Sequence, residues 1–331
     1  MPHPHRCRRA AAMAFGLATV CAAGAAAGET WPSRPITMVI PLAAGSGLDV
    51  VGRLLAARLG EILEQQIVVE NVGGAGGMTG AARVARAAPD GYQVLLGTVG
   101  THAQNQTLYR RPLYNASTDF APVLLVGEQP TVLIARRGLP ADDLAAFVAY
   151  AKANHGRMQY GSAGAGSAAH LACALFNSTA GLDVTHVPYR GGAAAMQDLI
   201  AGRIDYQCPA GTLAIPQIAD DKVKGIAILG KNRLPQLLQV ATADEQGLAG
   251  FAAGIWYGLF LPRNTPAPIV AKLHDSAAAA LETPALRQRL NEIGVELAPP
   301  ERRSPDYLAR FVASEIEKWA APIKASGLVV D

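Results

Sequence analysis

Two glycine-rich loops carry the residue types from which this chain could build a binding site. The first, Gly45-Ser46-Gly47, follows the apolar run Ile36–Ile40 and precedes a segment with helical apolar spacing. The second, Gly161–Ser167, repeats this layout about 120 residues later. A loop between a strand and a helix presents free backbone N–H groups and the positive end of a helix dipole, which together attract anions. The two loops therefore predict a site that holds both ends of a small anion across a cleft.

The first loop also admits a different chemistry, dinucleotide binding. Gly45 and Gly47 follow a strand, and Glu70 ends the next strand, where dinucleotide folds place a ribose-binding acid. The third glycine position of that motif is occupied by Val50. A Rossmann-type NAD-dependent oxidoreductase is therefore kept as the alternative function.

A hydrolytic site is a weaker interpretation of the second loop. His170 lies close in sequence to Ser162 and Ser167, which suggests a nucleophile and a base. Neither serine stands in a G-x-S-x-G elbow, however. We therefore expect His170 to orient the loop or to touch the ligand.

The elements that position these loops alternate between strand and helix. The expected strands are Ile36–Ile40, Ile67–Glu70, Val94–Gly97, Phe120–Val126, Thr131–Ala135, Met158–Tyr160, Val184–Val187, Ile204–Gln207, Gly225–Leu229 and Ile255–Leu261. The expected helices are Leu48–Leu63, Thr79–Arg86, Pro140–Asn154, a helix through His170 and Phe176, Ala193–Ala201, Ala267–Glu282 and Ser304–Ser326. This alternation predicts an α/β fold with a mainly parallel sheet, in which ligands bind at the carboxyl ends of the strands.

The pattern of the N-terminal residues indicates a signal peptide. Arg6, Arg8 and Arg9 precede the apolar stretch Ala10–Val20, and Ala25-Ala26-Ala27 has the small-residue form of a cleavage site. We therefore expect an exported protein that is cleaved near Ala27.

The charge balance argues against polyanionic partners. The chain of 331 residues has a formal net charge of +3, and half of its residues are hydrophobic. Removal of Met1–Ala27 takes away three of the 29 basic residues and no acidic residue, which leaves 26 of each sign. A neutral chain without a basic run is not expected to bind nucleic acid.

Cysteine usage gives no metal or cofactor site. Cys7 and Cys21 lie in the expected signal peptide, and Cys173 and Cys208 remain without C-x-x-C or zinc spacing. Export permits a Cys173–Cys208 disulfide. Two buried free thiols are the favoured interpretation, because spacing along the chain carries no information on distance.

A set of motifs spans nearly the whole chain after the signal peptide. They are W-P-S-R-P-I at Trp31–Ile36, P-L-A-A-G-S-G-L-D at Pro41–Asp49, V-V-E-N at Val68–Asn71, G-A-G-G at Gly74–Gly77, P-D-G-Y at Pro89–Tyr92, D-F-A-P-V at Asp119–Val123, Y-G-S-A-G-A-G-S-A-A-H-L at Tyr160–Leu171, H-V-P-Y-R-G-G at His186–Gly192, W-Y-G-L-F at Trp256–Phe260 and K-A-S-G at Lys324–Gly327. In this order and spacing they resemble the periplasmic substrate-binding proteins of tripartite tricarboxylate transporters, the Bug family.

This resemblance implies a fold and a function. It implies a two-domain flytrap of the type II periplasmic binding protein class, with a ligand cleft between the domains. We expect residues 28–130 and 255–331 to form one domain and residues 131–254 the other, with crossings near Pro130 and Ile255. It further implies a monomeric periplasmic protein that captures a di- or tricarboxylate or related acid, performs no chemistry on it, and delivers it to a membrane permease.

The candidate ligand contacts combine the two loops with positions matched to the family. They are Leu42, Ala44, Gly45, Ser46, Gly47, Asp49, Ser162, Ala163, Gly164, Gly166, Ser167, His170 and Pro209. Backbone N–H groups and the three serine hydroxyls are expected to hold carboxylate oxygens. Asp49 is interpreted mainly as a partner of the helix start. Ala174 and the segment Cys208–Gly211 stand where the family often has acidic or amide groups, which argues against an amino-acid ligand.

Overall fold

The computed structural model describes Met1 and residues 31–230, 232–325 and 329–330. Residues 1–30 and residues 31–331 form separate units, and the fold below is that of the second unit. Apart from Met1, the predicted signal peptide lies outside the described residues.

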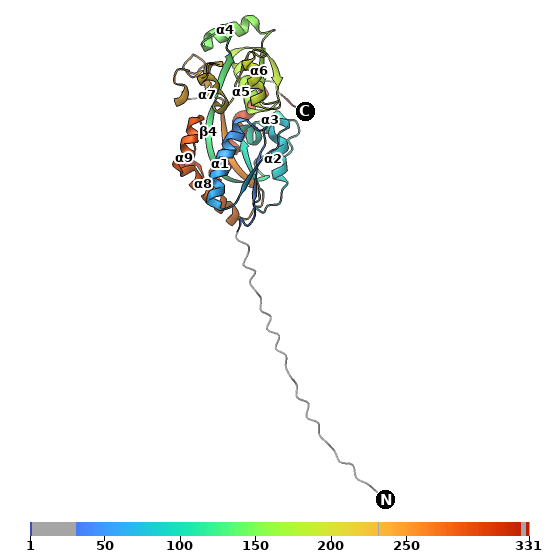
Figure 1. Cartoon of the computed structure of the whole chain (residues 1–331). Coiled ribbons are helices and arrows are strands. Elements are labelled where there is room, and N and C mark those ends of the chain that lie inside the picture. Colours follow the sequence, from blue (N-terminus) through green and yellow to red (C-terminus); the bar gives the residue numbers. More distant parts are fainter. Residues whose placement is uncertain (2–30, 231, 326–328, 331) are drawn as a thin grey trace. The chain divides into compact units, whose positions relative to one another are not determined.

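The unit is built from alternating strands and helices (Figure 1). The strands are β1 (Ile36–Ile40), β2 (Ile67–Asn71), β3 (Gln93–Thr98), β4 (Phe120–Arg136), β5 (Gln159–Ser162), β6 (Thr185–Pro188), β7 (Tyr206–Gln207), β8 (Val223–Leu229), β9 (Gly254–Pro262) and β10 (Glu296–Leu297). The helices are α1 (Gly47–Leu63), α2 (Met78–Ala85), α3 (Asn105–Leu108), α4 (Leu144–Asn154), α5 (Ala168–Ala180), α6 (Gly192–Ile200), α7 (Gly211–Ala219), α8 (Ala267–Glu282), α9 (Pro284–Glu292) and α10 (Pro305–Ala325).

One long strand, β4, belongs to two sheets. The strand order is β2-β1-β3-β9-β4-β7-β5-β6, and β8 and β10 also pair with β4. The first part of β4 pairs with β9 from Phe120 opposite Pro262 to Pro130 opposite Gly254. From Thr131 onward it pairs with β8, and Ile134 and Ala135 also pair with β7. Figure 1 shows α4 to α7 gathered at one end of β4, and α1, α2, α8 and α9 around the other.

Most of the expected elements are confirmed, with bounds that differ by a few residues. Two expected strands, Phe120–Val126 and Thr131–Ala135, are one continuous strand because partners change at Pro130 without a break in the ladder. The expectation of a mainly parallel sheet was wrong. The pairs of β1 and β5 are parallel, but every pair of β4 and β9 is antiparallel.

Helices α7 and α9 were not expected from the sequence. Pro216 lies inside α7, and a proline normally argues against a helix interior. Pro284 stands in the first turn of α9 directly after α8, so a proline that ends one helix also starts the next.

The apolar side chains of β4 alternate between its two faces, so this one strand contributes to two hydrophobic cores. Side chains alternate between the faces of a strand. Leu133 and Ala135 join the main apolar cluster, whereas Val132 and Ile134 join a second cluster around Met196. The C-terminal part of β4 is therefore buried on both faces. This buried segment helps to position the second loop.

A disulfide joins α5 to the end of β7. Cys173 and Cys208 are bonded, with their Cα atoms 5.4 Å apart. The favoured prediction of two free thiols is therefore wrong, because folding brings together two segments that are 35 residues apart. In the chain-entropy account, a crosslink over such a loop stabilises the fold by roughly 4 kcal/mol.

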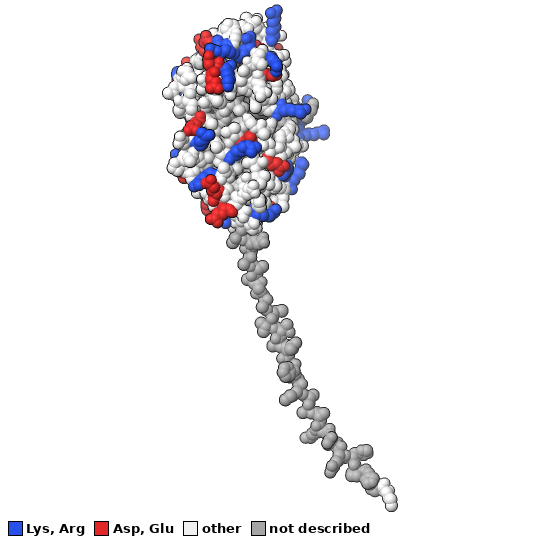
Figure 2. Space-filling model, viewed as in Figure 1, with Lys and Arg blue, Asp and Glu red and all other residues white. Residues whose placement is uncertain are grey.

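The visible face of the molecule has no large patch of one charge that would indicate a charged partner. Figure 2 shows acidic and basic side chains mixed over most of that face. No helix in the described part of the chain is long and apolar enough to cross a membrane.

Candidate functional site

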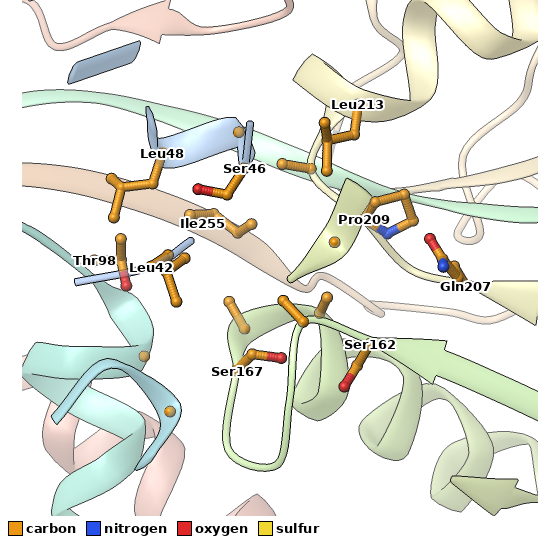
Figure 3. A pocket seen from close by; sticks show the side chains of 18 of the residues that line it. Leu42, Ser46, Leu48, Thr98, Ser162, Ser167, Gln207, Pro209, Leu213 and Ile255 are labelled. Atoms are coloured by element: carbon orange, nitrogen blue, oxygen red, sulfur yellow. The ribbon is translucent and has the colours of Figure 1, made fainter. Parts of the chain in front are cut away.

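The two glycine loops meet at a cavity (Figure 3). Its lining residues are Leu42, Ser46, Gly47, Leu48, Gly76, Thr98, Gly100, Ser162, Ala163, Ser167, Ala168, Ala169, Gly192, Gln207, Pro209, Ala210, Leu213, Ile255 and Tyr257. The cavity volume is about 60 Å³, counted as space for the centres of water-sized molecules. That volume is enough for a small molecule rather than a macromolecular segment.

The first loop forms the start of α1. Ser46 is the N-cap residue, and its hydroxyl oxygen accepts a hydrogen bond from the Asp49 N–H at 3.3 Å. Gly45 adopts a φ of +76°, a left-handed conformation that a residue with a side chain rarely takes. Gly47 and Leu48, the first residues of α1, line the cavity, and the N–H groups of a first helical turn have no partner within their helix.

Asp49 supports this loop from behind. Its carboxylate accepts hydrogen bonds from the Gly45 N–H at 2.9 Å, from Arg53 at 3.0 Å and from Asn71 at 2.9 Å. Burial alone would raise the pKa of Asp49, but these hydrogen bonds outweigh it and hold the pKa below its ordinary value. Asp49 does not line the cavity, so its geometry agrees with the expected role as a helix-start partner.

The second loop forms the start of α5 in the same way. Ser167 is the N-cap residue, and its hydroxyl oxygen accepts a hydrogen bond from the His170 N–H at 3.3 Å. His170 Nδ1 accepts a hydrogen bond from the Gly166 N–H at 3.0 Å. His170 therefore orients the loop, as expected, and does not reach the cavity.

Ser162 has a different histidine partner from the one that the sequence suggested. Its hydroxyl lies 2.7 Å from His186 Nε2 and also bonds the backbone N–H and C=O of Gly164. Within the described residues, no hydrogen bond joins His186 to a carboxylate that could orient it. The pair lacks the third member of a hydrolytic triad, and it holds the loop in its turn.

Two more helices begin at the cavity, and neither has a capping side chain. Gly191 precedes α6 and Ala210 precedes α7, and no side chain accepts a hydrogen bond from either first turn. Gly192, Ala210 and Leu213 line the cavity. The N-termini of α1, α5, α6 and α7 therefore surround one small space, and each carries a partial positive charge.

The cavity itself is uncharged but contains unused hydrogen-bonding groups. Among the residues that the structure describes, none that lines the cavity is charged. Gln207 Nε2 is buried without a hydrogen-bond partner, and so is Thr212 Oγ1, which lies beside Gly47.

The predicted contacts fall into two groups. Those that line the cavity are Leu42, Ser46, Gly47, Ser162, Ala163, Ser167 and Pro209. Ala44 and Gly45 are exposed, and Asp49 and His170 are buried behind the loops. Gly164 lines an adjoining hollow at the mouth of the cleft, and Gly166 packs against Tyr109.

Sequence reasoning missed 12 of the 19 residues that line the cavity. Thr98 ends β3 and Gln207 ends β7, and their positions at carboxyl strand ends were an available signal. Gly76 belongs to the G-A-G-G motif at Gly74–Gly77, which was not predicted to contact a ligand. Ile255 and Tyr257 come from β9, and no motif marks their approach to the cavity.

The two halves of the cleft touch each other. Tyr109 donates a hydrogen bond to the Ala165 C=O at 3.3 Å. A methyl group built on Gly47 would come within 2.2 Å of Thr212 Oγ1, so the starts of α1 and α7 are in direct contact. This arrangement is a closed cleft.

Comparison with known proteins gives a consistent result. The family profile described as the tripartite tricarboxylate transporter family receptor matches residues 51–328. A UPF0065 protein from the ttuE–ttuC' intergenic region of Agrobacterium vitis is 38% identical, with 94% of this chain and 89% of the relative covered.

Solved structures agree with the family profile. The periplasmic binding protein BugD has a TM-score of 0.87 at 37% identity, with 90% of this chain and 99% of that chain covered. MatC of Rhodopseudomonas palustris with bound malate has a TM-score of 0.86 at 40% identity, with coverage of 88% and 100%. The resemblance to the Bug family and the two-domain flytrap fold are thereby confirmed.

Three histidines whose pKa values are lowered in the folded protein make stability depend on pH; His102 and His170 are buried, and His186 is half-buried. Burial lowers the pKa of His102 to about 3 and that of His186 to about 4. Burial, with a contribution from His186, lowers the pKa of His170 to about 3. The folded protein keeps all three neutral, whereas the unfolded chain binds protons below about pH 6.5. We therefore expect the free energy of unfolding to fall on the order of 4 kcal/mol between pH 7.5 and pH 5.5.

Urea unfolding at several pH values measures this change. The His102→Phe variant should lose about a third of the pH dependence, because it removes one of three protons bound on unfolding. Equal stability at pH 7.5 and pH 5.5 would contradict the assignment of neutral buried histidines.

Proposed function

The chain belongs to the tripartite tricarboxylate transporter receptor family, and on this premise we propose that it captures a small organic carboxylate in the periplasm for a membrane uptake system. One observation carries the proposal: four helix N-termini surround a small cavity whose described lining has no charged side chain. Such an arrangement binds an anion through backbone N–H groups and helix dipoles. Support comes from MatC, a similar structure that is described with bound malate.

The contacts that we propose are those predicted residues that line the cavity. Ser46 and Ser167 use their hydroxyl oxygens as helix caps, so their hydroxyl protons stay available for carboxylate oxygens. The backbone N–H groups after each cap supply further donors. Ser162 contributes mainly by holding its loop, because His186 and Gly164 already engage its hydroxyl.

The proposed domains are residues 28–130 with 255–331 and residues 131–254. Support comes from the ladder between β4 and β9, which ends at the pair Pro130 and Gly254. Only these two strands would bend when the cleft opens. Closure on the ligand would bring the starts of α1 and α7 together and create the surface that the permease recognises.

The alternative, an NAD-dependent oxidoreductase, is not favoured. Glu70, which would bind ribose, pairs with Arg83 and does not line the cavity. We propose a monomeric receptor that releases its ligand unchanged.

Export is part of the same proposal. The family profile describes a receptor, and the sequence of Met1–Ala27 has the layout of a signal peptide. N-terminal sequencing of the exported protein should find a new terminus near Gly28, and an intact Met1 would contradict cleavage.

A ligand screen tests the main proposal. We expect succinate or malate, and not NADH, to raise the melting temperature of the purified protein. A ligand at a hundred times its dissociation constant adds about 2.7 kcal/mol, which is roughly 5 °C for a chain of this size. Stabilisation by NADH alone would refute the receptor function.

Closure can be tested at Gly47. In Gly47→Ala the added methyl group meets Thr212 Oγ1 at 2.2 Å, so the closed cleft is blocked. We expect calorimetry to show at least tenfold weaker carboxylate binding with little change in the ligand-free melting temperature. Adding Thr212→Ala removes the clashing oxygen and should restore most of the affinity.

Gly156→Ala is the matched control, because a methyl group there meets no atom within 4 Å. Wild-type affinity in Gly47→Ala would show that ligand binding does not need the closed arrangement.

A further inference from the structure

The side chain of Tyr109 makes a hydrogen bond that crosses the cleft. Tyr109 directly follows α3, and its hydroxyl donates to the Ala165 C=O of the second glycine loop at 3.3 Å. The two residues belong to different proposed domains. The side chain is buried, and its hydroxyl makes no other hydrogen bond among the described residues. A bond between two bodies exists only while they are together, so it favours the closed cleft over an open one.

The phenol ring lies between two glycines from opposite sides of the cleft. A methyl group built on Gly76 would lie 3.1 Å from the Tyr109 hydroxyl oxygen, and one built on Gly166 would lie 3.0 Å from it. Asn105 of α3 also donates a hydrogen bond to the Gly76 C=O at 3.1 Å. The absence of a side chain at both glycines lets the phenol approach the two loops this closely.

Tyr109 lies beside the ligand cavity and is not part of its lining. It lines the adjoining hollow at the mouth of the cleft. Gly76, on one side of the phenol, lines the cavity, and so do Ala163 and Ser167, which flank Ala165 in the second loop. An effect of the Tyr109 hydroxyl on ligand binding must therefore arise from the two loops that it joins.

Val330 holds the segment that carries this phenol. It forms a parallel β-bridge with Tyr109. Its N–H donates to the Leu108 C=O at 2.9 Å, and its C=O accepts from the Arg110 N–H at 3.1 Å. These bonds lie on both sides of Tyr109, so they fix its backbone to the proposed first domain while its side chain reaches the second.

We propose that Tyr109 is a latch of the closed cleft and that Val330 positions this latch. The inference rests on the closure that is part of the proposed function. A ligand in a closed cleft leaves when the cleft opens, so a bond made only in the closed state prolongs its retention. Tyr109 is therefore a positioning residue, which sets how long an anion is held and does not select which anion is bound.

Tyr109→Phe tests the latch, because it removes the hydroxyl and keeps the ring. Stopped-flow fluorescence with succinate measures the association and dissociation rates separately. One hydrogen bond of the closed state is lost, so we expect succinate to dissociate about fivefold faster. Association begins from the open cleft, so its rate constant should change less than about twofold.

Tyr150→Phe is the matched control for the loss of a hydroxyl. Tyr150 lies on α4, and its hydroxyl makes no hydrogen bond to a described residue. Both rates should stay at their wild-type values in this variant.

A further variant tests the support from Val330. Val330→Pro removes the N–H that donates to the Leu108 C=O. We expect faster dissociation of succinate, with little additional effect when Tyr109→Phe is also present, because both changes act through one contact. Val329→Pro is the control, since Val329 is exposed and its N–H makes no hydrogen bond to a described residue.

Closure can also be measured without a ligand. Lys152 on α4 and Lys272 on α8 are exposed and belong to different proposed domains. Spin labels on Lys152→Cys and Lys272→Cys report the distance between them by pulsed electron resonance. We expect Tyr109→Phe to shift the distance distribution away from that of the closed cleft, and Tyr150→Phe to leave it unchanged.

The outcomes separate the two proposals. If the wild-type protein binds neither succinate nor malate, the proposed function fails, while the label distances still decide whether Tyr109 keeps the cleft closed. If succinate binds but Tyr109→Phe keeps the wild-type dissociation rate and distances, only the latch is overturned. A lower melting temperature with unchanged rates and distances would also overturn it, because the hydroxyl would then stabilise the fold without acting on closure.

Discussion

The structure depends on one electrostatic constraint: an anion must be stabilised in a small cavity whose described walls carry no charge. A carboxylate that leaves bulk water for this cavity loses its hydration, so each of its oxygens needs a donor from the protein. Four helix N-termini supply those donors at the cavity. Backbone N–H groups have fixed positions and cannot be neutralised by a change in pH, which makes them dependable partners for an anion.

The remaining architecture places these helix ends. Ser46 and Ser167 each satisfy one N–H of the first turn, which fixes the chain at the helix start and leaves other donors free. Asp49 and His170 brace the two loops from behind. Because β4 belongs to both sheets and its ladder with β9 ends at Pro130 and Gly254, we propose that the cleft closes as two bodies that are joined there.

Local patterns predicted most of the elements and the two main loops, because strand–glycine–helix junctions are encoded by neighbouring residues. They could not predict that Gln207, Ile255 and Tyr257 reach the same cavity, since this depends on strand order. The continuous strand through Pro130 was missed for a related reason: a change of pairing partner leaves no mark in the sequence. The disulfide between Cys173 and Cys208 likewise depends on a distance that only the fold determines.

The most direct test of the account is a crystal structure of the mature protein with bound succinate. The account predicts one carboxylate within about 3.2 Å of backbone N–H groups at the starts of α1 and α5. A carboxylate held by a lysine or arginine side chain, or a ligand bound outside the cavity, would contradict the claim that helix N-termini provide the charge.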